Sequence, residues 1–253
     1  MPQRFRFDVE GEPLPAVVYA ASKPLGLTLL LGHGASGAQR DAFIVDHALG
    51  LADRGVLVVT YDFPYVAAGR SRPDRNEVLE ASCRAAVLAA RQCRPKNRLF
   101  IGGKSLGGRV ACEVAASGVE EIHGVVLLGY PLHAVGQPYA PRWGRLRDLR
   151  VPALIVQGTR DVFGTPAQLG TVLAELPEGT RIHAVEGGDH SFALPPRRRG
   201  EQGQVHDSIM DEIAEWMSLV GTAPLAQPGT PRPRPIAPRI GDQLRSLRVS
   251  ASS

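Results

Sequence analysis

Residues 102–108 have the sequence GGKSLGG, in which glycines flank a serine on both sides. Residues 98–101 before them predict a short buried strand, and residues 109–116 after them predict a helix. Within this stretch Gly103, Ser105 and Gly107 match G-x-S-x-G, a pattern in which a serine occupies a sharp turn from strand to helix. We expect Gly107 and Gly108 to leave room for a ligand beside the first turn of the helix, whose free N–H groups attract an anion. The same pattern occurs in ordinary glycine-rich turns, so the rest of the chain must decide between the two interpretations.

The length and the distribution of charge indicate one folded domain followed by a tail. A chain of 253 residues suffices for one sizeable α/β core, which we place at residues 1–220. Residues 221–253 hold six prolines and few large apolar side chains, so we expect a disordered tail. Five arginines and one aspartate give this tail a charge of +4, which is the whole net charge of the chain. The folded part is therefore neutral, and we expect no nucleic-acid partner. Either the tail binds a protein or it is passive.

Other features of the sequence concern its compartment and cofactors. The first residues lack the apolar segment of a signal peptide, and no apolar run is long enough to cross a bilayer. Cys83, Cys93 and Cys112 are too few for a disulfide framework. We expect a cytoplasmic protein with reduced thiols and no membrane partner. No group of His and Cys residues has the spacing of metal ligands, so neither a metal nor another cofactor is expected.

Strand and helix patterns alternate along the chain. Strands are predicted at residues 17–20, 27–31, 56–61, 98–101, 125–128, 151–157 and 181–185. Helices are predicted at residues 40–54, 78–89, 109–116, 167–175 and 205–220. The strands are continuous apolar runs, which is typical of parallel strands covered on both faces. The alternation predicts an α/β fold with a mostly parallel, doubly wound sheet flanked by helices.

Three reactive residue types follow predicted strands in the order Ser105, Asp161, His190. Ligands of open α/β sheets bind at the carboxyl ends of the strands, where all three are expected. A serine hydroxyl is a poor nucleophile and needs a base that is neutral near pH 7, for which His190 is the candidate. Asp161 would accept a hydrogen bond from the second ring nitrogen and so select the reactive tautomer.

A tetrahedral oxyanion also needs two backbone donors. Leu106 follows the serine, and Ala35 lies in the turn after residues 27–31, so we expect their N–H groups to form this hole. Asp189 and Asp62 are the alternatives to Asp161 as partner of His190. Asp189 is adjacent to His190 in sequence, and an adjacent side chain usually points elsewhere. Asp62 is interpreted as structural or as lining the cleft. His33 is expected to stabilise its turn.

The remaining histidines have no evident partners in the sequence. We expect them to be satisfied residues of the surface or core: His47, His123, His133, His183 and His206.

At these motifs the chain resembles the α/β-hydrolase superfamily, over about residues 16–220. The segments that carry the resemblance are residues 31–37 (LGHGASG), 102–107 (GGKSLG), 156–164 (VQGTRDVFG) and 187–192 (GGDHSF). They are similar to a branch that includes dienelactone-hydrolase-like proteins and testis-expressed hydrolase-like proteins. Dienelactone hydrolases use a cysteine nucleophile, whereas this chain has Ser105, so the resemblance implies a serine esterase rather than a lactonase.

The interval between residues 131 and 151 is too short for the helical cap of many α/β-hydrolases. We therefore expect a minimal cap and an open cleft that suits a small-molecule acyl substrate. Gly34, Lys104, Tyr139 and Trp143 are the expected substrate-binding residues. The predicted function is hydrolysis of a small ester through an acyl-enzyme. The alternatives are a non-catalytic interaction module and an acyltransferase or peptidase with the same three residues.

Overall fold

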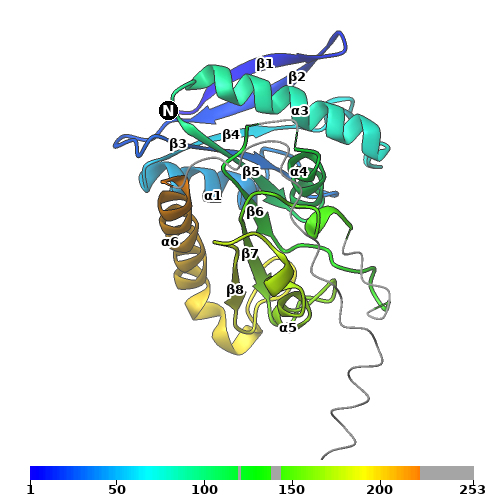
Figure 1. Cartoon of the computed structure of the whole chain (residues 1–253), viewed down its shortest axis with the longest axis vertical. Helices are drawn as coiled ribbons and strands as arrows, with labels where there is room; N and C mark the ends of the chain where they lie inside the picture. Colours follow the sequence, from blue (N-terminus) through cyan, green and yellow to red (C-terminus); the bar gives the residue numbers. More distant parts are fainter. Residues whose placement is uncertain (119–120, 138–143, 223–253) are drawn as a thin grey trace, which may run out of the picture.

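Figure 1 shows the computed structural model of the chain, which describes residues 1–118, 121–137 and 144–222. Its strands form one eight-stranded sheet in the order β1-β2-β4-β3-β5-β6-β7-β8. The strands are β1 (Gln3–Val9), β2 (Glu12–Tyr19), β3 (Leu27–Gly32), β4 (Val56–Tyr61), β5 (Arg98–Lys104), β6 (Gly124–Leu128), β7 (Ala153–Gly158) and β8 (Arg181–Val185). β1 and β2 are antiparallel to their neighbours, and the strands from β4 to β8 are parallel. The predicted mostly parallel α/β sheet is thus confirmed.

The helices lie between the strands in the chain or, for η3 and α6, after the last strand, and they cover both faces of the sheet. They are α1 (Ala42–Asp53), α2 (Pro64–Ala67), α3 (Asn76–Cys93), α4 (Leu106–Ala116), α5 (Pro166–Gly170) and α6 (Gln202–Gly221), with short 3-10 helices η1 (Gly144–Leu146), η2 (Leu173–Glu175) and η3 (Pro196–Glu201). Each long helix has an apolar stripe that it must bury. None of the helices that the structure describes has the length and apolarity needed to span a membrane.

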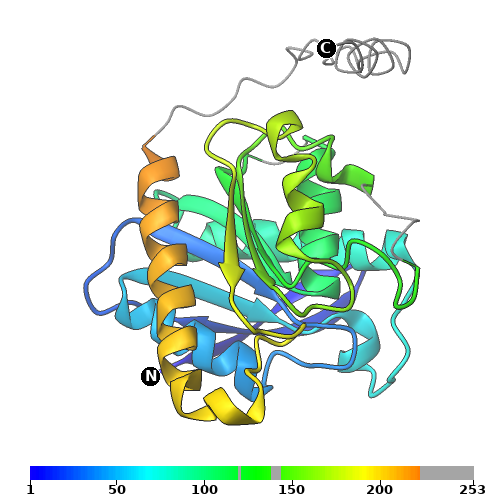
Figure 2. The ribbon, with the colours of Figure 1, turned by 90° about the horizontal axis from the view of Figure 1, so that it is seen from below.

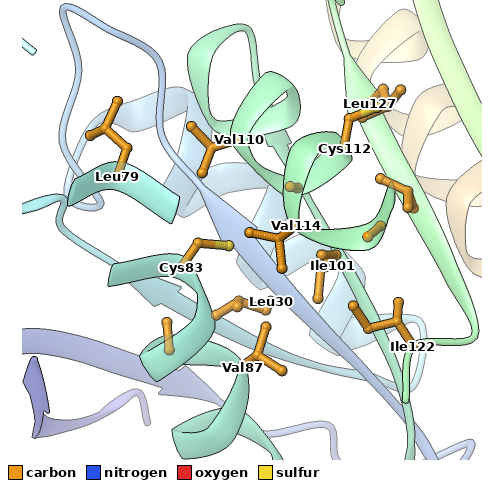
Figure 3. Close-up of a cluster of buried hydrophobic side chains, with 14 of the residues drawn as sticks. Leu30, Leu79, Cys83, Val87, Ile101, Val110, Cys112, Val114, Ile122 and Leu127 are labelled. Atoms are coloured by element: carbon orange, nitrogen blue, oxygen red, sulfur yellow. The ribbon is translucent and has the colours of Figure 1, made fainter. Parts of the chain in front are cut away.

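Two apolar clusters, one on each face, hold the layers together. One joins α3 and α4 to the sheet, and Figure 3 shows side chains such as Val87 and Val114 meeting Leu30 and Ile101 of the strands. The other joins α1 and α6 to the opposite face, with Trp216 fully buried. Figure 2 shows α6 running beside α1 along that face. Each fully buried Leu, Ile or Val side chain contributes about 1.5–3 kcal/mol of transfer free energy.

Central strands β3 and β4 are buried at every position, as their continuous apolar runs predict. Because the parallel strands share one direction, the carboxyl ends of β3, β5, β7 and β8 meet at one edge of the sheet. The turns and loops that follow these four strands carry the candidate site.

Two local predictions were wrong. β1 was missed, although Phe5, Phe7 and Val9 alternate with polar residues; its partner in the antiparallel ladder is β2, which also begins earlier than predicted. The helix predicted at residues 167–175 is divided into α5 and η2. Gly170 ends α5, and the buried residues Leu169, Val172 and Leu176 satisfy an apolar helical pattern without a continuous helix.

The division into a domain at 1–220 and a tail at 221–253 stays a prediction. α6 ends at Gly221, and only Gly221 and Thr222 of the predicted tail belong to the part of the chain that the structure describes.

Candidate active site

Ser105 stands alone between the last residue of β5 and the first residue of α4. Its backbone has φ 51° and ψ −107°, a conformation that L-residues adopt at a cost of about 1–3 kcal/mol. The flanking strand and helix fix both sides of the turn, because Ser105 N–H donates to Leu128 O at 2.9 Å and Ser105 O accepts from Arg109 N–H at 2.9 Å. The strained turn holds the serine side chain at the carboxyl edge of the sheet.

The glycines around Ser105 serve close packing of the backbone. A Cβ on Gly103 would lie 2.5 Å from Gly32 O, and one on Gly107 would lie 2.5 Å from the same oxygen. A Cβ on Gly108 would lie 2.7 Å from Gly103 O. The expectation that Gly107 and Gly108 leave room for a ligand is therefore wrong, because backbone of β3 and β5 fills that space. These glycines let α4 begin directly against the strands.

His190 joins Ser105 to Asp161 through two short hydrogen bonds. His190 Nδ1 lies 2.7 Å from Asp161 Oδ2, and His190 Nε2 lies 2.9 Å from Ser105 Oγ. Since the carboxylate can only accept, the neutral ring carries its hydrogen on Nδ1 and accepts the serine hydroxyl at Nε2. The Asp161 side chain is fully buried, whereas a fifth of the His190 side chain is exposed. The structure thus brings together three side chains that are 56 and 29 residues apart in sequence.

Both alternatives to Asp161 bind elsewhere. Asp189 Oδ1 accepts from the N–H groups of Ser191 and Ala193 at 2.8 and 2.9 Å, which closes the loop that carries His190. The Asp62 carboxylate accepts two hydrogen bonds from Gln39, through its backbone N–H at 2.8 Å and its side-chain amide at 3.1 Å. Neither carboxylate replaces Asp161 beside the imidazole ring.

Comparison with known proteins assigns the chain to a family. The sequence model of the family described as an alpha/beta hydrolase domain matches residues 26–218. The chain belongs to the α/β-hydrolase family. This confirms the resemblance inferred from the motifs.

Solved structures share the fold of this α/β-hydrolase. A serine hydrolase without a lid from Xanthomonas campestris is 21% identical, with a TM-score of 0.68, over 91% of this chain and 97% of that one. The esterase domain of a Rhodothermus marinus protein is 14% identical, with a TM-score of 0.65, over 87% and 98%. A dienelactone hydrolase from Anabaena variabilis is 19% identical, with a TM-score of 0.65, over 85% and 97%. At these identities the likeness shows the fold alone.

Two residues that the sequence reasoning missed hold Asp161 of the α/β-hydrolase in place. Gln157, at the buried end of β7, donates from Nε2 to Asp161 Oδ2 at 2.8 Å and to Gly164 O at 2.7 Å. Phe163 N–H donates to Asp161 Oδ1 at 2.8 Å, and its ring packs 4.4 Å from the His190 ring. A polar residue ending an otherwise apolar strand is the signal that could have identified Gln157.

The two expected oxyanion donors belong to different segments of the chain, α4 and the turn after β3. Leu106 is the first residue of α4, where backbone N–H groups have no partner within the helix. Ala35 belongs to the turn after β3, next to Gly34. A Cβ on Gly34 would lie 3.9 Å from Ser105 Cβ, so this turn is a close neighbour of the serine.

Lys104 lies directly before Ser105 and is only 8% exposed. Its ammonium sits 5.9 and 6.0 Å from the ring centroids of Phe43 and Phe192. Burial lowers its pKa to about 8, against a smaller opposing effect of Asp161 and Asp189. Its predicted contact with substrate stays a prediction. Tyr139 and Trp143, the other expected substrate-binding residues, lie outside the described residues.

Two of the histidines that we expected to have all buried nitrogens hydrogen-bonded do not. His47 Nε2 and His123 Nδ1 are buried without a hydrogen-bond partner among the described residues. The His47 ring instead stacks on Phe43 at 4.1 Å, and burial lowers its pKa to about 4, so the ring stays neutral. Packing on aromatic rings compensates in part for the missing hydrogen bond. No group of three metal-ligating side chains occurs in the described part of the chain.

Proposed function

We propose that this α/β-hydrolase is a serine hydrolase that cleaves small esters through an acyl-enzyme. The observation that carries the proposal is the hydrogen-bonded series from Asp161 through His190 to Ser105, at the carboxyl edge of a hydrolase sheet. Cleavage of an ester by such a series needs no further cofactor.

Each residue then has a defined role in the reaction. Ser105 Oγ attacks the ester carbonyl while His190 Nε2 takes the hydroxyl proton. The N–H groups of Leu106 and Ala35 stabilise the tetrahedral oxyanion. When the C–O bond breaks, His190 returns its proton to the leaving alcohol. Water, activated by the same ring, then hydrolyses the acyl-enzyme.

The short connection between β6 and β7 supports a small substrate. Its described residues, 129–137 and 144–152, contain one 3-10 helix, η1, and no longer helix. The structural relatives include a hydrolase without a lid and an esterase domain. We therefore infer an open site and a small-molecule acyl substrate. The esterase domain of the Rhodothermus marinus protein, which shares the fold, supports an ester as the type of bond.

The proposal is tested with a fluorophosphonate probe and a series of p-nitrophenyl esters of increasing chain length. We expect the probe to label Ser105 and the short esters to be turned over fastest. Ser105→Ala should lose both labelling and turnover, because the nucleophile is gone. Ser191→Ala is the matched control, since it removes an exposed hydroxyl beside His190 and should keep both. A folded chain that takes up no probe and hydrolyses no ester would contradict the proposal.

A further inference from the structure

Two carbonyl groups in the turn after β3, those of Gly34 and Ala35, accept hydrogen bonds that fix their directions. Gly34 O accepts from His33 Nδ1–H at 2.8 Å and from Gly37 N–H at 3.1 Å. Ala35 O accepts from the hydroxyl of Tyr65 at 2.7 Å. In a trans peptide the N–H points away from the carbonyl of the same plane, and the described chain has no cis peptide bonds. The Ala35 N–H is thus turned away from the His33 ring, and no hydrogen bond between described residues uses it.

His33 fixes the first of these peptide planes. Its Nε2 accepts from Phe63 N–H at 3.1 Å, so the neutral ring carries its hydrogen on Nδ1 and donates it to Gly34 O. The ring is fully buried, and burial lowers its pKa, so the neutral form persists at neutral pH. His33 acts only on the plane between Gly34 and Ala35.

Tyr65 fixes the next plane from a different part of the chain. It lies in α2, in the loop after β4, and is 1% exposed. Its ring packs against His33 and Phe63, with centroids 5.9 and 6.4 Å away. Burial raises the pKa of its hydroxyl to about 12, so this group remains a donor throughout the pH range of an assay. The hydroxyl also lies 3.4 Å from Gly34 O, which places it across both carbonyl groups.

These hydrogen bonds to Gly34 O and Ala35 O matter because Gly34 has no side chain. Glycine moves through more of φ/ψ space than other residues, so the plane that carries the Ala35 N–H is intrinsically mobile. Rotation of that plane must displace Ala35 O unless a second dihedral compensates. Holding Ala35 O from Tyr65 therefore limits the directions in which the Ala35 N–H can point.

We propose that Tyr65 is a positioning residue that orients the Ala35 N–H toward the oxyanion formed on Ser105. This inference rests on the proposed serine-hydrolase function. The Ala35 donor acts on charge that develops in the transition state, so its misorientation lowers kcat and leaves substrate binding almost unchanged. Loss of a whole oxyanion donor costs about 10²–10³ in kcat, and loosening one should cost about tenfold.

Tyr65→Phe tests this inference, with Tyr61→Phe as the matched control. Tyr61 is also a fully buried tyrosine, and its hydroxyl interacts with Cys83 in the core. Three quantities are measured for each protein: kcat and KM for p-nitrophenyl butyrate, and the inhibition constant of a trifluoromethyl ketone, which forms a tetrahedral oxyanion on a reactive serine. For Tyr65→Phe we expect kcat to fall about tenfold, KM to change less than twofold, and the inhibition constant to rise about as much as kcat falls. For Tyr61→Phe all three should change less than about twofold.

A second variant shows where Tyr65 acts. Ala35→Pro removes the N–H itself, so adding Tyr65→Phe to it should cost less than about twofold in kcat. A full tenfold loss in the double variant would overturn the inference, as would an unchanged kcat in Tyr65→Phe or a change confined to KM. If the wild-type chain neither hydrolyses esters nor reacts with a fluorophosphonate, the proposed function fails and this inference fails with it. An active wild type with an unaffected Tyr65→Phe variant overturns the role of Tyr65 alone.

Discussion

Asp161→Asn is expected to lower kcat for ester hydrolysis by about 10³–10⁴ at neutral pH. Asp161 Oδ2 accepts from both His190 Nδ1 and Gln157 Nε2, and Oδ1 accepts from Phe163 N–H. An amide supplies only one oxygen to these three donors. If its NH2 group faces His190, the ring must place its hydrogen on Nε2, where it can no longer take the proton of Ser105. If its NH2 group faces Phe163, two donors meet and the side chain is displaced.

The measurement is the rate of hydrolysis of a p-nitrophenyl ester at equal concentrations of folded protein. Asp189→Asn is the matched control, because its side-chain oxygen continues to accept from Ser191 and Ala193. It should change kcat by less than about threefold. If kcat falls equally in Asp161→Asn and Asp189→Asn, the proposed role of Asp161 is wrong. The loss would then reflect a general requirement for an intact His190 loop.

Lys104→Met is expected to stabilise the protein at pH 7 by up to about 3 kcal/mol, which raises Tm by roughly 5–10 °C. Burial lowers the pKa of Lys104 from 10.5 to about 8. Below pH 8 the Lys104 ammonium is charged in both the folded and the unfolded chain, and its burial raises the free energy of the folded chain alone. The aromatic rings of Phe43 and Phe192 offset part of this cost.

The sign of the pH dependence follows from proton binding. Between about pH 8 and 10.5 the unfolded chain holds the Lys104 proton and the folded chain has released it, so wild-type stability rises with pH. The advantage of Lys104→Met should therefore shrink across this interval and vanish above it. Urea unfolding of both proteins at pH 7, 9 and 10.5 measures the effect.

Lys96→Met is the control for this prediction, since Lys96 is exposed. Its stability should stay within about 0.5 kcal/mol of wild type at each pH. A Lys104→Met variant that is less stable than wild type at pH 7 would contradict the account of a costly buried cation. The KM of the same variant for short esters tests the predicted contact between Lys104 and substrate.

Much of the fold could be predicted because the signals are local and repeated. The strand predicted at residues 56–61 coincides with β4, and the continuous apolar runs correctly indicated parallel strands covered by helices. β1 was missed because its alternation of Phe with Arg and Asp is short and partly exposed. The segment is recognised as a strand only from its pairing with β2, and that pairing is seen only in the tertiary structure.

The candidate site was predictable only in outline. Ser105, Asp161 and His190 each follow a predicted strand. Because the strands are parallel, their carboxyl ends lie at one edge of the sheet, and the sequence could therefore predict that the three residues meet there. Gln157 is marked in the sequence only as a polar residue near the end of an apolar strand, and Tyr65 is not marked at all. The hydrogen-bond partners of both depend on the direction of their side chains. The role of Gly107 and Gly108 also depends on the tertiary structure, because backbone atoms occupy the space that the sequence analysis assigns to a ligand.

The sequence by itself determined the α/β architecture, the strained serine turn after β5 and the identity of the three candidate side chains. Those features follow from periodicity and residue chemistry, which act over a few positions of the chain. Only the tertiary structure decided that His190 reaches both Ser105 and Asp161, that Lys104 is buried, and that Tyr65 holds the turn at Ala35. Hydrogen bonds and burial depend on distances of a few tenths of an ångström between residues far apart in the chain, and such distances are set by packing of the whole core.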